Sequence, residues 1–182
     1  MKKTAIIWGL AAVLVVAAYF VTANYNRNQA LNSPSTSNGL SSESPGGKAI
    51  AFSLLDTDGK KVSLDDFKGK YVYLNFFATW CPPCRAEMPD IERVYQEYKN
   101  KNLVVLAVNL GEDSKTVKDF FTQNDLSFKA LLDSNRSIAQ KYGISAIPVS
   151  IFIDRQGNIA AKKVGEMTRS DMEANIEILL KK

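Results

Sequence analysis

Two cysteines separated by a pair of prolines, in the segment Trp80-Cys81-Pro82-Pro83-Cys84, are the side chains of this sequence best suited to redox chemistry. An apolar run precedes them and a helical pattern follows, so Cys81 is expected at a helix N-terminus, where free N–H groups and the helix dipole favour a thiolate. A thiolate is the attacking species in thiol–disulfide exchange. Cys84, one turn further along the helix, could then attack the sulfur of Cys81 and release a bound partner. The two prolines fit the first helical turn, where a missing N–H costs little, and they should influence the reduction potential.

The cysteine pair has two alternative interpretations, an inert structural disulfide and half of a metal site shared with a second chain. A disulfide that closes so short a loop constrains the unfolded chain little compared with one that closes a long loop. Two cysteines cannot supply the four soft ligands of a structural zinc site, and the sequence contains no histidine. The lack of histidine also removes the usual general base and any Cys–His dyad. Exchange chemistry is therefore favoured, with the Cys81–Cys84 disulfide as the redox centre and with no metal and no other cofactor.

The elements that must position the cysteines alternate between strands and helices. Two apolar, β-rich runs have the character of central strands covered on both faces, Tyr71–Ala78 before the cysteines and Leu103–Asn109 after the helix that follows them. Further strands are expected at Ala51–Leu55, Lys61–Ser63, Phe128–Leu132, Val149–Ile153 and Ile159–Val164. The first two of these flank Asp56-Thr57-Asp58-Gly59, which predicts a hairpin turn rather than a calcium loop.

The helix that begins at the cysteine pair has apolar side chains at three- and four-residue spacing. Its expected buried stripe is Cys84, Met88, Ile91, Val94, Tyr95 and Tyr98. Pro89 falls inside this helix, where it frees a carbonyl group and should kink the axis. Three further helices are expected: Ser114–Asn124, a short helix capped by Asp133 or Ser134 and ending at Gly143, and a final helix with a capping box of Ser170 and Glu173. This alternation predicts an α/β fold with a mixed sheet.

The first 47 residues differ in composition from the rest. Two lysines precede an uncharged, mostly apolar run from Ala5 to Ala23, which as a helix approaches the ~30 Å hydrocarbon thickness of a bilayer. We interpret residues 1–23 as a membrane anchor, with a cleaved signal peptide as the alternative because Val21-Thr22-Ala23 resembles a cleavage site. Residues 24–47, rich in Ser, Asn, Pro and Gly, are expected to be a flexible linker, and residues 48–182 the folded domain. The lysines should stay in the cytoplasm, which places the domain on the outer face of the cell membrane, attached by a single pass.

The net charge of the protein is small. The chain has 23 basic and 19 acidic residues, and half of the net charge of +4 lies in residues 1–47, where Lys2, Lys3 and Arg27 stand against Glu43. No basic run with interleaved aromatic residues occurs. We therefore exclude nucleic acid as a partner.

The residues around the cysteines resemble the active site of the thioredoxin superfamily. The resemblance rests on the segment from Tyr73 to Cys84, on Pro89 five residues later, and on Ile147-Pro148 before a strand. Within the superfamily, roughly residues 48–182 are similar to the membrane-anchored ResA/TlpA-like thiol–disulfide oxidoreductases of bacteria. The resemblance implies a thioredoxin fold, with a mixed central β-sheet flanked by helices, an N-terminal β-hairpin and an extra helix–strand insertion.

The resemblance also implies roles for single residues. Pro148 should follow a cis peptide bond and lie against Cys81, where the neighbouring backbone can pair with an incoming cysteine peptide. By position alone it is equally well read as a proline at the start of a strand. Ile147 departs from the Thr often found before this proline, which leaves the substrate preference open. Glu87 matches a Glu of the ResA-like proteins and is expected to be the acid–base group for Cys84, with a solvated first-turn glutamate as the alternative.

Three more residues near the cysteines carry expectations. Asn75 stands where cytosolic thioredoxins carry a buried Asp that relays protons, which an amide group cannot do. Trp80 is expected to shield the disulfide and to offer an apolar docking surface, with a purely packed Trp as the alternative. We place Pro83 in the same substrate-binding surface, together with Ile147 and Pro148.

By this resemblance the chain is expected to be a monomeric enzyme that reduces disulfides in exported proteins. Apocytochrome c is the substrate that the resemblance suggests, and a membrane protein of the CcdA type the electron donor. Reduction of spore-envelope or other secreted proteins, or an oxidase that delivers disulfides, would use the same chemistry. A thiol peroxidase is disfavoured, because Thr79 is only two residues before Cys81 and no proline occupies the upstream place of a Pro-x-x-x-Thr-x-x-Cys pattern. A binding module that does not use its thiols is the alternative from a different class.

Overall fold

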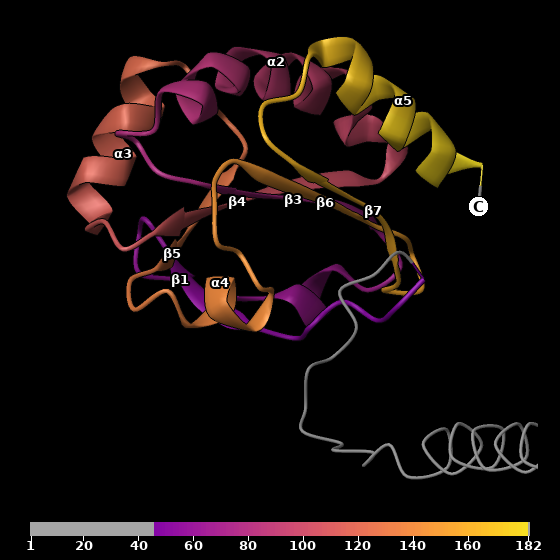
Figure 1. Cartoon of the computed structure of the whole chain (residues 1–182), viewed down its shortest axis with the longest axis horizontal. Helices are drawn as coiled ribbons and strands as arrows, with labels where there is room; N and C mark the ends of the chain where they lie inside the picture. The colour runs from indigo at the N-terminus through magenta and orange to yellow at the C-terminus, as the bar shows by residue number, and fades with distance from the viewer. Residues whose placement is uncertain (1–45, 182) are drawn as a thin grey trace, which may run out of the picture. The chain divides into compact units, whose positions relative to one another are not determined.

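The computed structural model describes residues 46–181, which form alternating strands and helices (Figure 1). The strands are β1 (Ser53–Asp56), β2 (Lys61–Ser63), β3 (Tyr71–Phe77), β4 (Leu103–Leu110), β5 (Lys129–Asp133), β6 (Val149–Ile153) and β7 (Ile159–Val164). The α-helices are α2 (Pro82–Tyr98), α3 (Ser114–Gln123), α4 (Ser137–Lys141) and α5 (Arg169–Leu180), with short 3-10 helices at Leu64–Phe67 and Lys99–Lys101. The expected anchor and nearly all of the expected linker lie outside the described residues. Within residues 46–181, no helix has both the length and the apolar character needed to cross a membrane.

The described strands form one seven-stranded mixed sheet in the order β2-β1-β5-β4-β3-β6-β7. The three strands β3, β4 and β5 run parallel to one another. The hairpin of β1 and β2 pairs antiparallel with β5, and β6 and β7 continue antiparallel from β3 on the other side. The predicted mixed sheet and N-terminal hairpin are confirmed, and α3 and β5 lie between β4 and α4, where the extra helix and strand are expected.

The sheet is covered on both faces: α2, α3 and α5 lie over one face and α4 over the other (Figure 1). Strand β3 is therefore buried along its whole length. Tyr73 and Phe77 pack into the core beneath α2, and Leu74 and Phe76 pack into the core on the α4 side. Because successive side chains of a strand point to opposite faces, covering both faces explains why the sequence of β3 is an uninterrupted apolar run.

The helix that follows the cysteines has the predicted buried stripe. Its buried apolar side chains are Cys84, Met88, Ile91, Val94 and Tyr98, and Tyr95 is partly buried. Glu87 is buried in the same face, although the apolar pattern does not include it. Pro89 lies inside the helix and does not end it, because α2 continues to Tyr98.

The start of α5 differs from the prediction. Thr168 is the N-cap, and it forms a capping box in which its side chain accepts from the Asp171 N–H while the Asp171 carboxylate accepts from the Thr168 N–H. The expected capping box of Ser170 and Glu173 is wrong. Thr168 is the last residue with extended backbone angles (φ −76°, ψ 160°), so Ser170 already lies within the first helical turn.

The N-cap position of α4 is taken by Arg136 and not by the expected Asp133 or Ser134, but Arg136 makes no side-chain capping bond, and the free N–H groups of the helix are bound instead by Asp133. The buried carboxylate of Asp133 accepts hydrogen bonds from the backbone N–H groups of Ile138 (3.0 Å) and Ala139 (2.8 Å). These groups belong to the first turn of the helix, where N–H groups have no partner within the helix. The end of β5 is thereby tied to α4.

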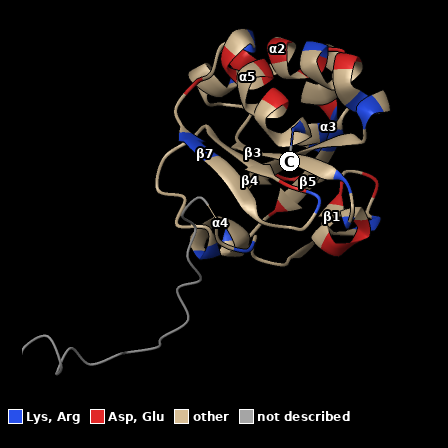
Figure 2. Ribbon diagram, turned by 90° about the vertical axis from the view of Figure 1, so that its right-hand side faces the viewer, with Lys and Arg blue, Asp and Glu red and all other residues tan. Residues whose placement is uncertain are grey.

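Two of the three helices on the cysteine side of the sheet, α2 and α5, are more acidic than basic. Both α2 and α5 carry more Asp and Glu than Lys and Arg, and the two signs are interspersed along them (Figure 2). These two helices therefore do not offer the continuous basic face that a nucleic acid would require.

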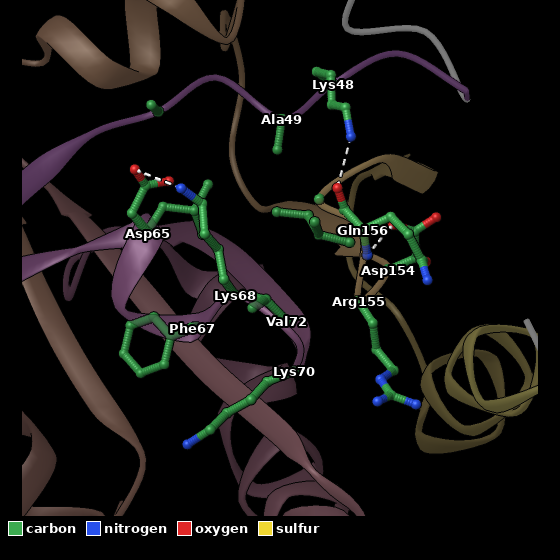
Figure 3. A pocket seen from close by; sticks show the side chains of 14 residues that line it. Lys48, Ala49, Asp65, Phe67, Lys68, Lys70, Val72, Asp154, Arg155 and Gln156 are labelled. Carbon is green, nitrogen blue, oxygen red and sulfur yellow. Dashed lines mark hydrogen bonds and ion pairs between the residues drawn. The ribbon is translucent and has the colours of Figure 1, made fainter.

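A pocket of about 240 Å³ lies at the end of the sheet away from the cysteines (Figure 3). Its lining includes Val72, near the start of β3, and Ile153, the last residue of β6, whereas the cysteines follow the end of β3. Lys48 lies at its rim and donates to the carbonyl oxygen of Gln156 at 2.6 Å. This pocket is separate from the site described next.

Candidate active site

Cys81 and Cys84 lie where β3 passes into α2, as the sequence predicts. Cys81 is the N-cap of the helix, with extended backbone angles (φ −84°, ψ 111°), and the two prolines occupy the first two helical positions. The cysteines form a disulfide with an S–S length of 2.12 Å and a Cα–Cα distance of 5.3 Å. The Cys84 N–H points at the sulfur of Cys81 at 3.3 Å. A thiolate at Cys81 would therefore receive a backbone hydrogen bond and the field of the helix N-terminus.

The loop before β6 lies against the disulfide. The peptide bond between Ile147 and Pro148 is cis, as expected. The carbonyl oxygen of Ile147 is 3.9 Å from the sulfur of Cys81. Pro148, the next residue, is buried and directly precedes β6. The tertiary structure thus joins two segments 66 residues apart at one sulfur atom.

Trp80 is exposed next to the disulfide. Its side chain is 66% exposed, so the alternative of a purely packed Trp is wrong. Pro83 and Ile147 are each partly exposed. An exposed indole ring costs free energy in water, since apolar area there is left unburied. Trp80 is thus free to contact another molecule.

Glu87 is buried rather than solvated. It is 1% exposed, so the alternative of a solvated first-turn glutamate is wrong. One carboxylate oxygen accepts from the Asn75 amide at 2.8 Å, and the other accepts from the backbone N–H of Met167 at 3.1 Å. Burial raises the pKa of the Glu87 carboxyl to about 7; the two hydrogen bonds oppose this effect and the charge of Glu166 adds to it. Glu87 can therefore gain or lose a proton near neutral pH.

Asn75 links Glu87 to a chain of buried hydroxyl groups. The same Asn75 nitrogen that contacts Glu87 also contacts the Ser150 hydroxyl at 3.2 Å, and the Ser150 hydroxyl lies 3.0 Å from the Tyr73 hydroxyl. Burial, and secondly the charge of Glu87, raise the pKa of the Tyr73 hydroxyl far above its ordinary value, so this group stays protonated. Sequence reasoning missed Ser150 and Tyr73, because their contact depends on the antiparallel pairing of β3 with β6.

A second polar cluster holds the turn that precedes the disulfide. The Glu112 carboxylate accepts from the backbone N–H of Thr79 at 2.7 Å, from the Thr79 hydroxyl, and from the Asn109 amide at 2.6 Å. The Arg85 guanidinium donates to the Thr79 carbonyl oxygen at 3.2 Å. Glu112 was also missed from the sequence, since it lies 33 residues after Thr79 and matches no local motif. These bonds fix the backbone from which Trp80 and Cys81 project.

No group of three or more Cys, Asp or Glu side chains within residues 46–181 is arranged to hold a metal ion. A disulfide at a helix N-terminus, with the exposed Trp80 beside it and a carboxyl group that titrates near neutral pH in the same helix, is an arrangement suited to thiol exchange.

Comparison with known proteins places this geometry in a family. The sequence model of the Redoxin family matches residues 44–180. The chain is 38% identical over 132 residues to the thiol-disulfide oxidoreductase ResA of Bacillus cereus, which covers 72% of this chain and 76% of that protein. It is 37% identical over 132 residues to ResA of Bacillus subtilis, covering 72% and 74% of the two chains.

Solved structures agree with the sequence comparison. A Chlorobium tepidum protein assigned as the thiol:disulfide interchange protein DsbE superposes with a TM-score of 0.72 at 33% identity, covering 76% of this chain and 99% of that one. StoA from Bacillus subtilis superposes with a TM-score of 0.61 at 29% identity, covering 70% and 96%. The fold is thus shared with proteins named for thiol–disulfide chemistry.

Proposed function

This chain belongs to the Redoxin family as a thiol–disulfide oxidoreductase of the ResA/DsbE type, and on that premise we propose that it reduces disulfides in exported proteins through Cys81 and Cys84. Apocytochrome c, whose cysteines must be reduced before haem attachment, is the substrate we propose. The observation that carries the proposal is the Cys81–Cys84 disulfide at the start of α2, with the Ile147 carbonyl oxygen 3.9 Å from the sulfur of Cys81.

The proposed reaction has two exchange steps. The Cys81 thiolate attacks one sulfur of a substrate disulfide, which forms a mixed disulfide and releases the other substrate sulfur as a thiolate. Cys84 loses its proton and attacks the sulfur of Cys81, which re-forms the Cys81–Cys84 disulfide and releases the second substrate thiolate. The substrate gains two electrons and this protein loses two. A membrane donor of the CcdA type is proposed to return them.

The surface around the sulfurs supports a role in substrate binding. We propose that Trp80, Pro83, Ile147 and Pro148 bind the polypeptide that carries the target disulfide. Trp80 is the exposed apolar side chain of this group, and the Ile147 carbonyl oxygen lies 3.9 Å from the sulfur of Cys81. An extended peptide could therefore lie between the Trp80 ring and the loop before β6.

The location of the reaction is proposed from the sequence. The apolar run within residues 1–23 follows two lysines, which favours a single membrane pass with the N-terminus in the cytoplasm. The oxidoreductase domain would then face the outside of the cell. A dithiol there tends to become oxidised, so a tether that keeps it near a membrane donor fits the proposed direction of electron flow.

The equilibrium reduction potential of the Cys81–Cys84 pair tests the direction of the reaction. We expect a value close to that of thioredoxin, about −270 mV, because a reductase must transfer electrons to substrate disulfides. The potential can be measured by equilibrating the protein in glutathione or dithiothreitol buffers and following the thiol content. A potential near that of DsbA, about −120 mV, would make the protein an oxidase and contradict the proposal.

We propose that Glu87 is the acid–base group for Cys84. Both side chains are buried in the same face of α2, one helical turn apart, and a carboxyl group with a pKa of about 7 can accept a thiol proton at neutral pH. A Glu87→Gln variant is expected to resolve the mixed disulfide about 100-fold more slowly at pH 7. Rapid-mixing exchange kinetics as a function of pH, together with thiol titrations, would measure the effect.

The matched control for that measurement is Asp90→Asn. Asp90 lies on the same helix and pairs at 2.5 Å with Arg93 on the surface, so its removal should leave the pH profile unchanged. Unchanged cysteine pKa values and exchange rates in Glu87→Gln would remove Glu87 from the mechanism.

A further inference from the structure

We infer that Ser150 and Tyr73 are positioning residues: through the side-chain amide of Asn75 they favour the ionised form of the Glu87 carboxyl group. The inference rests on the proposed function only for the use that the enzyme makes of Glu87. The hydrogen-bond chain itself joins Glu87, Asn75, Ser150 and Tyr73 within the buried core.

This row of hydrogen bonds results from the pairing of two neighbouring strands. Asn75 on β3 lies directly opposite Ser150 on β6 in the antiparallel register, so their side chains point to the same face of the sheet. Tyr73 precedes Asn75 by two residues and therefore shares that face. Its ring stacks on Phe152 with the ring centres 4.6 Å apart, which directs its hydroxyl group to Ser150.

One atom of this hydrogen-bonded group of four side chains has no hydrogen-bond partner. The Asn75 side-chain oxygen is buried without a hydrogen bond, whereas the Asn75 nitrogen contacts both Glu87 and Ser150. If the amide were turned over, its oxygen would face those two groups and both N–H bonds would lack acceptors. Buried N–H groups without a partner are rarer in proteins than under-satisfied carbonyl oxygens. The observed orientation is therefore the favoured one while Glu87 and Ser150 both act as acceptors.

The preference depends on the protonation of Glu87. When the carboxyl group is ionised it can only accept, so the Asn75 amide must donate to it. When the carboxyl group is protonated its O–H can donate, and the turned amide can accept through its oxygen. A hydroxyl group can both donate and accept, so Ser150 and Tyr73 can follow either arrangement, with the direction of every hydrogen bond reversed.

Removing the Ser150 hydroxyl should penalise the two forms unequally. In the ionised form, an alanine at this position leaves one Asn75 N–H without an acceptor inside the core. In the protonated form, the turned amide keeps the O–H of Glu87 as a donor to its oxygen, so little is lost. Ser150→Ala should therefore raise the pH at which Glu87 titrates, by roughly half to one unit.

Removing the Tyr73 hydroxyl should act in the same direction and more weakly. Tyr73→Phe leaves the Ser150 hydroxyl in place as an acceptor for Asn75 but takes away the group to which Ser150 donates.

The other groups that face Glu87 are the Met167 N–H and the Glu166 carboxylate from the segment before α5, and Cys84 on its own helix. Glu166→Gln removes a like charge and should shift the midpoint of the Glu87 titration to lower pH. This variant therefore provides a shift opposite in direction to the one expected for Ser150→Ala.

The test is a titration of the full chain with the Cys81–Cys84 disulfide intact, so that the cysteines do not titrate. Carboxyl carbons of ¹³C-labelled glutamate are followed by NMR from about pH 4 to about pH 9, and the Glu87 signal is identified by its loss in Glu87→Gln. We expect the midpoint to rise in the order wild type, Tyr73→Phe, Ser150→Ala. Ser150→Thr keeps a hydroxyl group and should restore the wild-type value.

Tyr142→Phe is the matched structural control. Tyr142 is also fully buried and its hydroxyl donates to the Ile50 carbonyl oxygen at 2.8 Å, but it packs in the core on the other face of the sheet. Its loss should reduce stability without moving the Glu87 midpoint. If Ser150→Ala does not fold, the comparison of Tyr73→Phe with Tyr142→Phe decides the question.

An unchanged or lowered midpoint in folded Ser150→Ala would overturn the inference, as would equal midpoints in the two Tyr→Phe variants. The proposed function fails separately. Exchange rates that do not respond to Glu87→Gln would remove the acid–base role, whereas the NMR midpoints would still report whether Ser150 and Tyr73 act on Glu87.

Discussion

A Cys81→Ser variant is expected to lose disulfide reductase activity down to the rate without protein, whereas Cys84→Ser is expected to form mixed disulfides that it cannot release. The two cysteines differ in their surroundings. Cys81 caps α2, receives the Cys84 N–H at 3.3 Å and adjoins the exposed Trp80. Cys84 is completely buried in the helix. Cys81 is also buried in the disulfide form, at 3% exposed, but it lies at the very start of the helix beside Trp80, whereas Cys84 lies one turn further in. We therefore expect the substrate disulfide to react at Cys81 and Cys84 to react only with Cys81.

The measurement combines activity and trapping. Reduction of a protein disulfide such as that of insulin is followed with dithiothreitol as electron source, for the wild type and both single variants. Mixed disulfides are detected as covalent complexes on non-reducing gels, and they should disappear when a reductant cleaves the disulfide bond. In cell extracts, the proteins trapped by Cys84→Ser would identify the substrates.

Two outcomes would contradict the assignment. Trapping by Cys81→Ser rather than by Cys84→Ser would exchange the roles of the two cysteines. A double variant, Cys81→Ser with Cys84→Ser, that retains the biological role of the protein would instead favour the binding module that does not use its thiols.

The stability of the oxidised protein is expected to fall as the pH rises through the titration of Glu87. The pKa of the Glu87 carboxyl is about 7 in the folded protein because the group is buried, against 4.5 for an exposed glutamate. The folded state therefore holds this proton more tightly than the unfolded chain. The contribution of Glu87 to stability is greatest below about pH 4.5 and decreases until the folded state has also released the proton, at about pH 7. The total loss is about 3 kcal/mol.

Glu87→Gln should abolish this dependence. A glutamine resembles the protonated acid: its amide N–H can donate to the Asn75 oxygen that now lacks a partner, and its oxygen can accept from Met167. The variant should therefore be more stable than the wild type at pH 8. Since the sequence contains no histidine, the side chain most often responsible for pH dependence in this range is absent.

Urea unfolding of the oxidised protein between about pH 5 and about pH 8 measures the effect. Glu92→Gln is a useful control, because hydrogen bonds from Ser127 and Gln96 outweigh burial and lower the pKa of that carboxyl, which places its titration below this range. A wild-type unfolding free energy that is constant over this range, or that rises, would show that Glu87 is not held as a neutral acid in the fold.

The redox centre and the order of the elements can be predicted from the sequence because both depend on neighbouring residues. The apolar run of β3, the proline pair at the start of α2 and the helical spacing after Cys84 are local patterns, and the structure confirms each of them. The cis proline is predicted only through the resemblance, since Pro148 alone is equally consistent with a strand start. The capping box of α5 was misplaced by two residues, because two overlapping pairs of polar side chains satisfied the same pattern.

The surroundings of the cysteines depend on contacts between distant segments. Helical spacing places Glu87 on the same face of α2 as Cys84, but it does not show that this face is covered there. Glu87 is buried because β3 and the segment at Met167 meet α2 at this point. Ser150 faces Asn75 only because β6 pairs antiparallel with β3 in one register, and a shift by one residue would point it to the other face. Glu112 holds Thr79 only because β4 lies beside β3.

The cysteine pair and its exchange chemistry thus follow from the sequence by itself, since a thiol at the start of a helix is defined by residues a few positions away. The tertiary structure alone decides the surroundings of the carboxyl group that we propose as the acid–base partner of that pair. Burial, which comes from packing, is what brings the pKa of Glu87 close to neutral pH, and strand pairing is what connects Glu87 to Asn75, Ser150 and Tyr73.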